Sequence, residues 1–174
     1  MPDAVAAIVS VASNIEPEEN IPRALAALVE RATIEALSLF YVTAPIGRPE
    51  QDHYYNGAVR LRHQGGARRL KLDVLRPIED SLGRVRTGDR YAPRPIDLDL
   101  LLYGMQILEE PDLALPDPSL LTRPFLAVAA AEVALDPALP GMGTSLDALA
   151  SSEARAGLTP AAEFSRLMKE RFLP

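Results

Sequence analysis

The chain contains no cysteine, no tryptophan and only two histidines among its 174 residues. Without cysteine it can form no disulfide, no thiolate metal site and no cysteine nucleophile, and this usage fits a reducing compartment. We therefore expect a cytoplasmic protein. Aromatic residues make up only 5% of the chain, so each aromatic residue in a candidate binding site carries more weight.

Long hydrophobic runs are also missing. No apolar stretch approaches the ~20 residues that cross a bilayer, and no basic segment precedes apolar residues 4–11 as it would in a secretion signal. The formal net charge of −6 disfavours general nucleic-acid binding, which needs a basic surface. With 48% hydrophobic and 24% charged residues, a chain of this length suits a single core. We expect one domain over residues 1–174, without a membrane or nucleic-acid partner.

The hydrophobic pattern predicts an α+β fold. Continuous or alternating apolar residues indicate strands at 4–11, 34–42, 54–63 and 96–104, the last with a hairpin partner at 106–108. Apolar residues at helical spacing predict helices at 21–29, 68–82, 124–133 and 161–172. Pro77 should kink or delay the second helix because proline lacks a backbone donor, and Ser145 could cap a short helix ending at Leu149. This order of elements indicates helices packed on an antiparallel sheet.

The strongest local signal is the Asp97-Leu-Asp99 sequence within an apolar strand. Alpha carbons two residues apart in extended chain are roughly 6.5–7 Å apart, so two carboxylates on one face can share a pair of divalent metals. An exposed sheet face also alternates aspartate with leucine, and that explanation is the commoner one for an isolated D-x-D. Here three leucines follow Asp99, so the strand end should be buried, where unpaired carboxylates are costly. The apolar residues expected on the opposite face are Ile96, Leu98, Leu100 and Leu102.

Four arginines precede this strand in a segment rich in turn residues: Arg84, Arg86, Arg90 and Arg94. By themselves they would suit a solvated loop. Next to paired aspartates they suit a polyphosphate with magnesium, because carboxylates bind hard cations and guanidinium groups fork onto phosphate oxygens. The residues therefore indicate a phosphoryl-type transferase.

Several separated motifs resemble those of 6-hydroxymethyl-7,8-dihydropterin pyrophosphokinases, enzymes of the folate pathway. The resemblance covers roughly residues 4–149 and leaves a helical tail at 151–174. Its motifs are Ser13-Asn14, the loop 43–47, Y-Y-N-G-A-V at 54–59, Glu79 before L-G-R-V-R at 82–86, P-R-P-I-D-L-D at 93–99, and L-Y-G at 102–104. The resemblance implies a ferredoxin-like α+β sandwich. It also implies transfer of diphosphate from ATP to the pterin hydroxymethyl group, with release of AMP.

The resemblance also implies a role for each matching residue. Asp97 and Asp99 would hold two Mg²⁺ ions that bridge the triphosphate, while Arg84 and Arg94 would grip its oxygens as catalytic residues. Further nucleotide contacts are implied for Glu79, Arg86, Arg90, Tyr91, Ile96, Asp117 and Arg123. Pterin contacts are implied for Thr43, Ala44, Ile46, Tyr54, Asn56 and Phe125. In that set, the rings of Tyr54 and Phe125 would sandwich the heterocycle and the Asn56 amide would read its pyrimidine edge; without the resemblance, both rings would be assigned to core packing.

Three positions depart from the family pattern. Ala12 replaces a usual glycine, so the first loop should be less free to adopt positive φ, and Tyr91 replaces a usual tryptophan. Asp117 replaces a usual histidine that contacts ATP; its carboxylate would repel phosphates or accept hydrogen bonds from ribose. These changes suggest weaker or altered nucleotide binding with the metal chemistry retained, and Asp117→His should lower the KM for ATP.

Alternative functions stay open at this point. The chain could be a paralogue that uses a related pterin or another nucleotide donor, or a non-catalytic pterin- or nucleotide-binding module. An RNA-recognition domain shares the ferredoxin-like topology but would need a basic face. The two histidines, His53 and His63, are expected at the surface. The sequence does not determine the oligomeric state, for which a monomer is the expectation.

Overall fold

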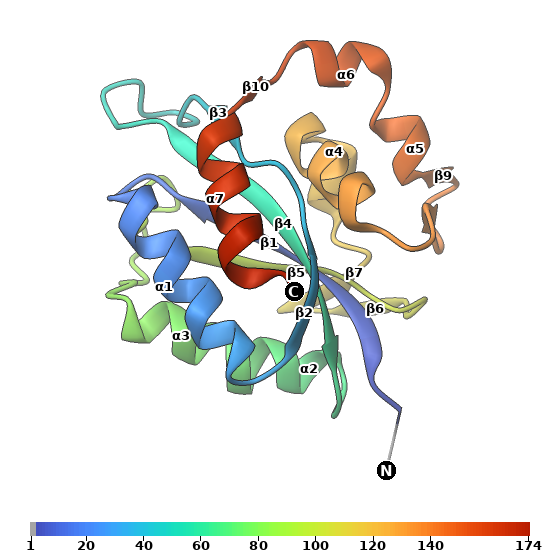
Figure 1. The fold of residues 1–174 in the computed structure, drawn as a ribbon. Helices are drawn as coiled ribbons and strands as arrows, with labels where there is room; N and C mark the ends of the chain where they lie inside the picture. The colour runs from blue at the N-terminus through green and yellow to red at the C-terminus, as the bar shows by residue number, and fades with distance from the viewer. Residues whose placement is uncertain (1–2) are drawn as a thin grey trace.

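In the computed structural model, which describes residues 3–174, a six-stranded antiparallel sheet forms the centre of the chain (Figure 1). The strands run in the order β10-β3-β4-β1-β5, and β2 also pairs with β4. Their bounds are β1 (Val5–Ser13), β2 (Thr33–Leu37), β3 (Tyr41–Thr43), β4 (Tyr54–His63), β5 (Asp97–Tyr103) and β10 (Thr159–Pro160). Helical crossovers join β1 to β2 and β4 to β5, which gives the ferredoxin-like arrangement. The predicted α+β fold with an antiparallel sheet is confirmed.

One face of the sheet is covered by helices that flank its full width (Figure 1). They are α1 (Pro17–Val29), α2 (Ala67–Arg69), the π-helical η1 (Leu70–Leu75), α3 (Arg76–Ser81) and α7 (Ala162–Phe172). Leu25 of α1 and Ile78 of α3 belong to the same buried cluster as Val9, Val59 and Leu100 of the strands. This apolar layer fixes the sheet from one side.

The other face is covered only in part. Helices α4 (Pro124–Val133), α5 (Leu146–Leu149) and α6 (Ser152–Ala156) lie there, with η2 (Pro118–Leu121) and the small hairpin β8 (Ala138–Leu139)–β9 (Thr144–Ser145). A second hairpin, β6 (Leu108–Glu110)–β7 (Leu113–Leu115), contributes Leu113 and Leu115 to the core of the opposite face. Leu126 and Val133 of α4 pack against Ile8 and Ala58. The Ser145 hydroxyl accepts from the Ala148 amide at 3.2 Å, so the predicted cap is confirmed.

The segment around Pro77 was predicted to be a disturbed helix, and this is confirmed. It divides into α2, the π-helical η1 and α3, with Pro77 at the start of α3. Proline removes one donor and its ring clashes with the carbonyl one turn back. The wider turn of a π-helix accommodates both effects.

The strand predicted over residues 34–42 is wrong as a single element, because the chain leaves the sheet at Ser38–Phe40 between β2 and β3. The Ser38 hydroxyl accepts from the Ala58 amide at 2.8 Å, in place of a backbone carbonyl. The Phe40 amide donates instead to the Ser165 hydroxyl of α7 at 2.8 Å. Side-chain hydrogen bonds thus replace ladder bonds, which a hydrophobic pattern does not reveal.

Two predictions at the end of β5 are also wrong. Val9 pairs with Leu100 and Ile8 with Leu102, so Leu101 forms a bulge. The bulge reverses the alternation, and Leu102 packs in the α4 cluster while Leu100 faces α1 and α3. The strand predicted at 106–108 pairs forward, as β6 with β7, and not back onto β5.

The C-terminal residues complete the sheet. Thr159 of β10 pairs with Val42 of β3, and the Phe164 ring of α7 meets the rings of Phe40 and Tyr55 edge-on, each at 5.2 Å between centroids. The predicted C-terminal helix is confirmed as α7. Within residues 3–174, none of the helices combines the length and apolar character that a membrane span requires.

The two histidines have different environments. His53 is exposed, as predicted. His63 is buried, so its predicted surface position is wrong; its Nδ1 lies 3.4 Å from the Tyr103 hydroxyl. Burial and the nearby Arg69 lower the pKa of His63, which keeps the ring neutral inside the fold.

Candidate active site

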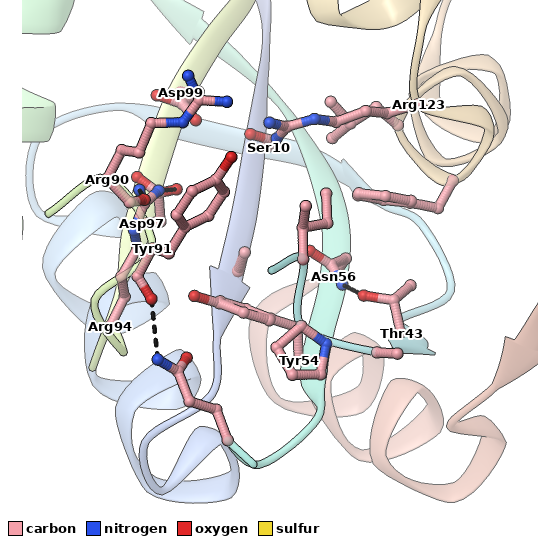
Figure 2. A pocket seen from close by; sticks show the side chains of 17 residues that line it. Ser10, Thr43, Tyr54, Asn56, Arg90, Tyr91, Arg94, Asp97, Asp99 and Arg123 are labelled. Atoms are coloured by element: carbon pink, nitrogen blue, oxygen red, sulfur yellow. Dashed lines mark hydrogen bonds and ion pairs between the residues drawn. The ribbon is translucent and has the colours of Figure 1, made fainter. Parts of the chain in front are cut away.

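The part of the sheet that α4 leaves uncovered forms a cavity of about 310 Å³ (Figure 2). Strands β1, β4 and β5 supply its floor. Ser10 of β1 pairs with Asp99 of β5, and Ala12 pairs with Asp97 on one side and Asn56 on the other. Because alternate strand residues share a face, this register brings all five side chains to the cavity, which they line.

The two aspartates have unequal environments. Asp99 is exposed to the cavity, whereas Asp97 is partly buried. The charge of Asp97 raises the pKa of Asp99 to about 8; loss of water contacts at the floor of the cavity and the charge of Asp117 add to the shift. A second negative charge close by disfavours ionisation of Asp99.

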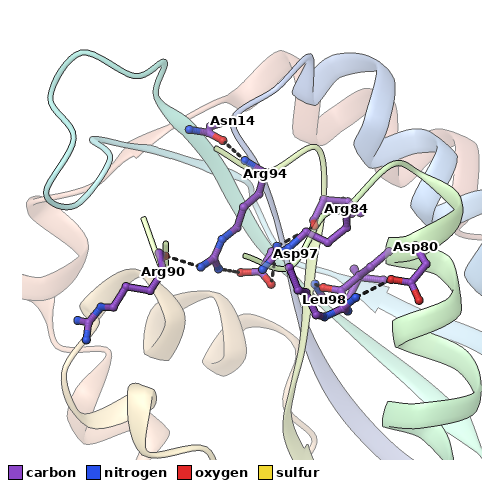
Figure 3. Close-up of polar contacts among 10 residues, drawn as sticks. Asn14, Asp80, Arg84, Arg90, Arg94, Asp97 and Leu98 are labelled. Atoms are coloured by element: carbon purple, nitrogen blue, oxygen red, sulfur yellow. Dashed lines mark hydrogen bonds and ion pairs between the residues drawn. The ribbon is translucent and has the colours of Figure 1, made fainter. Parts of the chain in front are cut away.

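Two arginines occupy both carboxylate oxygens of Asp97 (Figure 3). Arg94 Nη1 donates to Oδ2 at 2.5 Å, and Arg84 Nη1 lies 3.3 Å from Oδ1. Each arginine also donates to the backbone: Arg84 to the Ile96 carbonyl at 3.1 Å and Arg94 to the Arg90 carbonyl at 2.7 Å. The guanidinium groups are thereby oriented beside the aspartates.

The side of the cavity opposite these charges is formed by β4 and the end of β3. The Asn56 amide nitrogen donates to the Thr43 hydroxyl at 2.6 Å, which leaves the amide oxygen free to accept from a ligand. Burial raises the pKa of the Tyr54 hydroxyl. All six residues with implied pterin contacts line this cavity: Thr43, Ala44, Ile46, Tyr54, Asn56 and Phe125.

The residues with implied nucleotide contacts are divided. Arg90, Tyr91 and Arg123 line the cavity. The other four are not among the lining residues: the Ile96 side chain is buried in the core, Glu79 is buried beside Arg86, and the Asp117 carboxylate accepts from the Ser119 amide at 2.8 Å as the cap of η2.

Three loops at the mouth of the cavity are tied together by residues that sequence reasoning did not place in the site. Asn14 Oδ1 accepts from the Arg94 amide at 2.7 Å, and Asn14 Nδ2 donates to Gln51 Oε1 at 3.2 Å. Gln51 Nε2 in turn donates to the Tyr91 carbonyl at 2.8 Å.

Ser10 could have been found from its alternation with Ala12 in β1. Gln51 carries no comparable local signal, because its partners are 37 and 40 residues away.

The first departure from the family pattern has no conformational effect. Ala12 lies within β1, and in residues 3–174 the positive-φ residue that is not glycine is Glu16. The expectation that Ala12 restricts a positive-φ loop is therefore wrong. Tyr91, the second departure, lies over Gly47 (φ +73°), where a Cβ would be 3.4 Å from its ring, and the Arg90 guanidinium stacks on it at 4.8 Å.

The donor set fits magnesium better than a metal held by protein alone. Across residues 3–174, no group of three or more His, Cys, Asp or Glu side chains is arranged to hold a metal ion. Mg²⁺ usually takes one or two carboxylates and completes its octahedron with substrate phosphates and waters. Asp97 and Asp99 supply that number of carboxylates.

Comparison with known proteins agrees with this geometry. The family model for 7,8-dihydro-6-hydroxymethylpterin-pyrophosphokinase matches residues 8–135. A 2-amino-4-hydroxy-6-hydroxymethyldihydropteridine pyrophosphokinase of Synechocystis is 38% identical over 143 residues, which are 80% of this chain and 72% of that protein. The Pseudomonas aeruginosa enzyme of the same name is 37% identical over 135 residues, 76% of this chain and 82% of that one.

Solved structures show the same fold. The chain matches Plasmodium falciparum HPPK-DHPS with a TM-score of 0.64 at 12% identity, over 99% of this chain and 44% of the longer one. The extent of the family match and the identities to the curated relatives show that this chain belongs to the 7,8-dihydro-6-hydroxymethylpterin-pyrophosphokinase family.

Proposed function

We propose that Asp97 and Asp99 hold the magnesium ions of the pyrophosphokinase reaction and that Arg84 and Arg94 bind the triphosphate. The reaction itself follows from family membership: the chain is an ATP-dependent pyrophosphokinase of folate biosynthesis. It transfers diphosphate from ATP to the hydroxymethyl group of 6-hydroxymethyl-7,8-dihydropterin, and AMP is released.

The observation that carries this assignment is the pair of aspartates at the floor of the cavity. Asp97 and Asp99 share one face of β5 at the floor of the cavity, and Asp97 raises the pKa of Asp99 to about 8. Like charges held together by a fold are typical of sites completed by a ligand. When bound, magnesium would supply positive charge that both relieves this repulsion and neutralises the phosphate oxygens.

Arg84 and Arg94 can exchange partners when the substrate binds. In the ligand-free arrangement both guanidinium groups pair with Asp97. Asp97 would hold the metal ion, and the arginines would then bind phosphate oxygens, which guanidinium groups can bind in bidentate fashion. Arg90, Tyr91 and Arg123 line the cavity and would extend the contacts to the nucleotide.

The pterin would occupy the part of the cavity near β3 and β4. Tyr54 and Phe125 both line it and can stack on a flat heterocycle. The Asn56 amide is 6% exposed and held by Thr43, so its orientation is fixed before substrate arrives. An amide offers both a donor and an acceptor to the pyrimidine edge.

Catalysis would consist mainly of positioning and charge stabilisation. The hydroxymethyl oxygen attacks the β-phosphorus of ATP and loses its proton to solvent water, while the bond from that phosphorus to the α–β bridging oxygen breaks and AMP leaves with that oxygen. Arg84 and Arg94 would stabilise the charge that develops on the transferred group. The role of the stacked pterin is to align the hydroxymethyl group with this bond.

We also infer that residues 1–174 act as one domain. The helix α7 shares the main core with α1 and α3, and β10 extends the sheet.

The test is AMP release from MgATP with and without 6-hydroxymethyl-7,8-dihydropterin, in the wild type, Asp97→Ala and Glu35→Gln. Glu35 is a matched control, since it is an ion-paired carboxylate in the same sheet but outside the cavity. We expect pterin-dependent AMP in the wild type and the control and none in Asp97→Ala. AMP from Asp97→Ala at the wild-type rate would overturn the metal assignment. Pterin binding without AMP would point to another donor, which GTP in place of ATP would reveal, or to a binding-only protein.

A further inference from the structure

The carboxylate of Glu79 is buried on the far side of β5 from the cavity. It is 5% exposed, and it extends from α3 to the strand that carries the aspartates. Its Oε1 accepts from the Leu98 amide at 2.8 Å, and its Oε2 pairs with Arg86. Leu98 is the residue between Asp97 and Asp99, so Glu79 contacts the backbone at the centre of the site.

The hydrogen bond to Glu79 gives a partner to a backbone amide at the edge of the sheet. β5 is the outermost strand beside β1, and Leu98 pairs with Val11 of β1. In an edge strand, alternate amides point away from the neighbouring strand and need another partner. An unpaired buried amide costs free energy, and a charged acceptor gives a strong bond. Glu79 therefore holds the strand at the one amide between the two aspartates.

Glu79 also holds the base of the arginine loop. Its backbone carbonyl accepts from the Arg84 amide at 3.0 Å, while its side chain pairs with Arg86, which also reaches the exposed Asp80 at 2.5 Å. One residue thus joins the segment that carries Arg84 to the strand that carries the aspartates. Movement of either relative to the other would break a buried contact.

We propose that Glu79 is a positioning residue of the metal site: its reach to the Leu98 amide sets the placement of Asp97 and Asp99 beside the arginine loop. This differs from direct nucleotide contact, because Glu79 does not line the cavity. The inference rests on the proposed function, in which these aspartates bind the metal. Groups that orient metal ligands from behind typically change metal affinity by roughly 10- to 100-fold when they are lost.

Two conservative variants distinguish the length of the Glu79 side chain from its charge. Glu79→Gln keeps the length and the acceptor oxygen but loses the charge, whereas Glu79→Asp keeps the charge but is one methylene too short. Asp80→Asn is the matched control, since it removes a partner of Arg86 without affecting Leu98. The readouts are Mn²⁺ binding by electron paramagnetic resonance with α,β-methylene-ATP, hydrogen exchange of the Leu98 amide, and the KM for the pterin.

We expect Glu79→Asp to weaken Mn²⁺ binding roughly 10-fold or more and to lose protection of the Leu98 amide, with the KM for the pterin unchanged. Glu79→Gln and Asp80→Asn should bind Mn²⁺ like the wild type. The inference is overturned if Glu79→Asp binds Mn²⁺ normally, if Glu79→Gln is the more damaging variant, or if pterin KM and metal binding change together. An Asp97→Asn variant that still binds Mn²⁺ normally would refute the metal site itself, so the two failures are distinguishable.

Discussion

Charged side chains gather at two ends of the same sheet, and the two groups behave in opposite ways. At one end, Glu35 of β2 lies between Arg60 and Arg62 of β4, with Nε–O distances of 3.0 and 2.8 Å. The hydrogen bond from Arg62 is the main reason why the pKa of Glu35 is lowered. At the other end, Asp97 raises the pKa of Asp99 to about 8.

The difference separates a structural cluster from a functional one. The single carboxylate of Glu35 is neutralised within the chain, so it needs no further partner. Asp97 is paired with Arg84 and Arg94, but its charge still disfavours ionisation of Asp99. Unfavourable interactions between like charges are typical of sites where a bound ligand offsets the repulsion. The raised pKa of a carboxylate is therefore a better indicator of the active site here than the number of charged side chains.

The largest effect on activity should follow from a substitution that removes one of the two aspartate charges. We predict that Asp99→Asn lowers kcat/KM by ~10³-fold, about 4 kcal/mol of transition-state stabilisation, because the proposed metal site loses one of its two carboxylates. The same change should leave the thermal midpoint of the ligand-free protein equal or higher, since it removes a repulsion. Steady-state kinetics and calorimetry measure the two quantities.

Glu35→Gln is the counterpart at the other end of the sheet. It should leave kcat/KM unchanged and lower the thermal midpoint. The comparison breaks down if Asp99→Asn destabilises the protein as Glu35→Gln does, because Asp99 would then be a structural charge as well.

Much of the site could be predicted from local patterns. Strand alternation alone places Asp97 and Asp99 on one face, and the motif at 54–59 predicts that Tyr54 and Asn56 enter the same site. The structure brings these residues together because β1 pairs with both β4 and β5. What the residues alone could not assign was the pterin; that came from the resemblance, since Tyr54 and Phe125 also suit a core.

Other features depend on contacts between distant residues and leave no periodic signal. The bulge at Leu101 redirects Leu102, and Ser38 replaces a backbone group in the ladder. The bond from the Leu98 amide to Glu79 joins residues 19 apart. Each is set by the tertiary packing around it, which overrides local hydrophobic alternation.

A smaller effect should come from the third acidic residue near the aspartates. Asp117 is among the groups that raise the pKa of Asp99, and its Oδ1 caps η2 by accepting from Ser119. Asparagine can keep that cap while it removes a charge that repels the triphosphate. We predict that Asp117→Asn lowers the KM for ATP about threefold to tenfold, with the KM for the pterin unchanged.

Asp117→His should shift the KM for ATP in the same direction, because it also removes the negative charge. Ser119→Ala is the control for the cap, since it removes one hydrogen bond to Asp117 but leaves the charge. An unchanged or higher KM for ATP in both Asp117 variants would show that this carboxylate faces away from the phosphates.

The smallest effect is a pair of opposite pH dependences in the ligand-free protein. The pKa of Asp99 is raised from 3.8 to about 8, so between these values the folded protein holds a proton that the unfolded chain has lost. Stability from Asp99 is complete below its unfolded pKa and lost as pH rises toward about 8. Buried Glu79, whose pKa is raised to about 7, adds to the same decline. The lowered pKa of Glu35 has the reverse consequence: its stabilisation is present above 4.5 and lost as pH falls through its folded-state pKa.

We therefore predict that Asp99→Asn flattens the fall in thermal midpoint between about pH 5 and pH 8, leaving the part due to Glu79. Glu35→Gln should instead reduce stability by about 0.5–1 kcal/mol near neutral pH and flatten the loss on acidification. Calorimetry across this range, without magnesium or nucleotide, measures both slopes. The prediction fails if both variants change the pH dependence of the thermal midpoint in the same part of the range, either both on acidification or both as the pH rises toward 8. Opposite changes would show that the charge of Glu35 stabilises the fold, whereas a charge on Asp99 destabilises it in the absence of a bound cation.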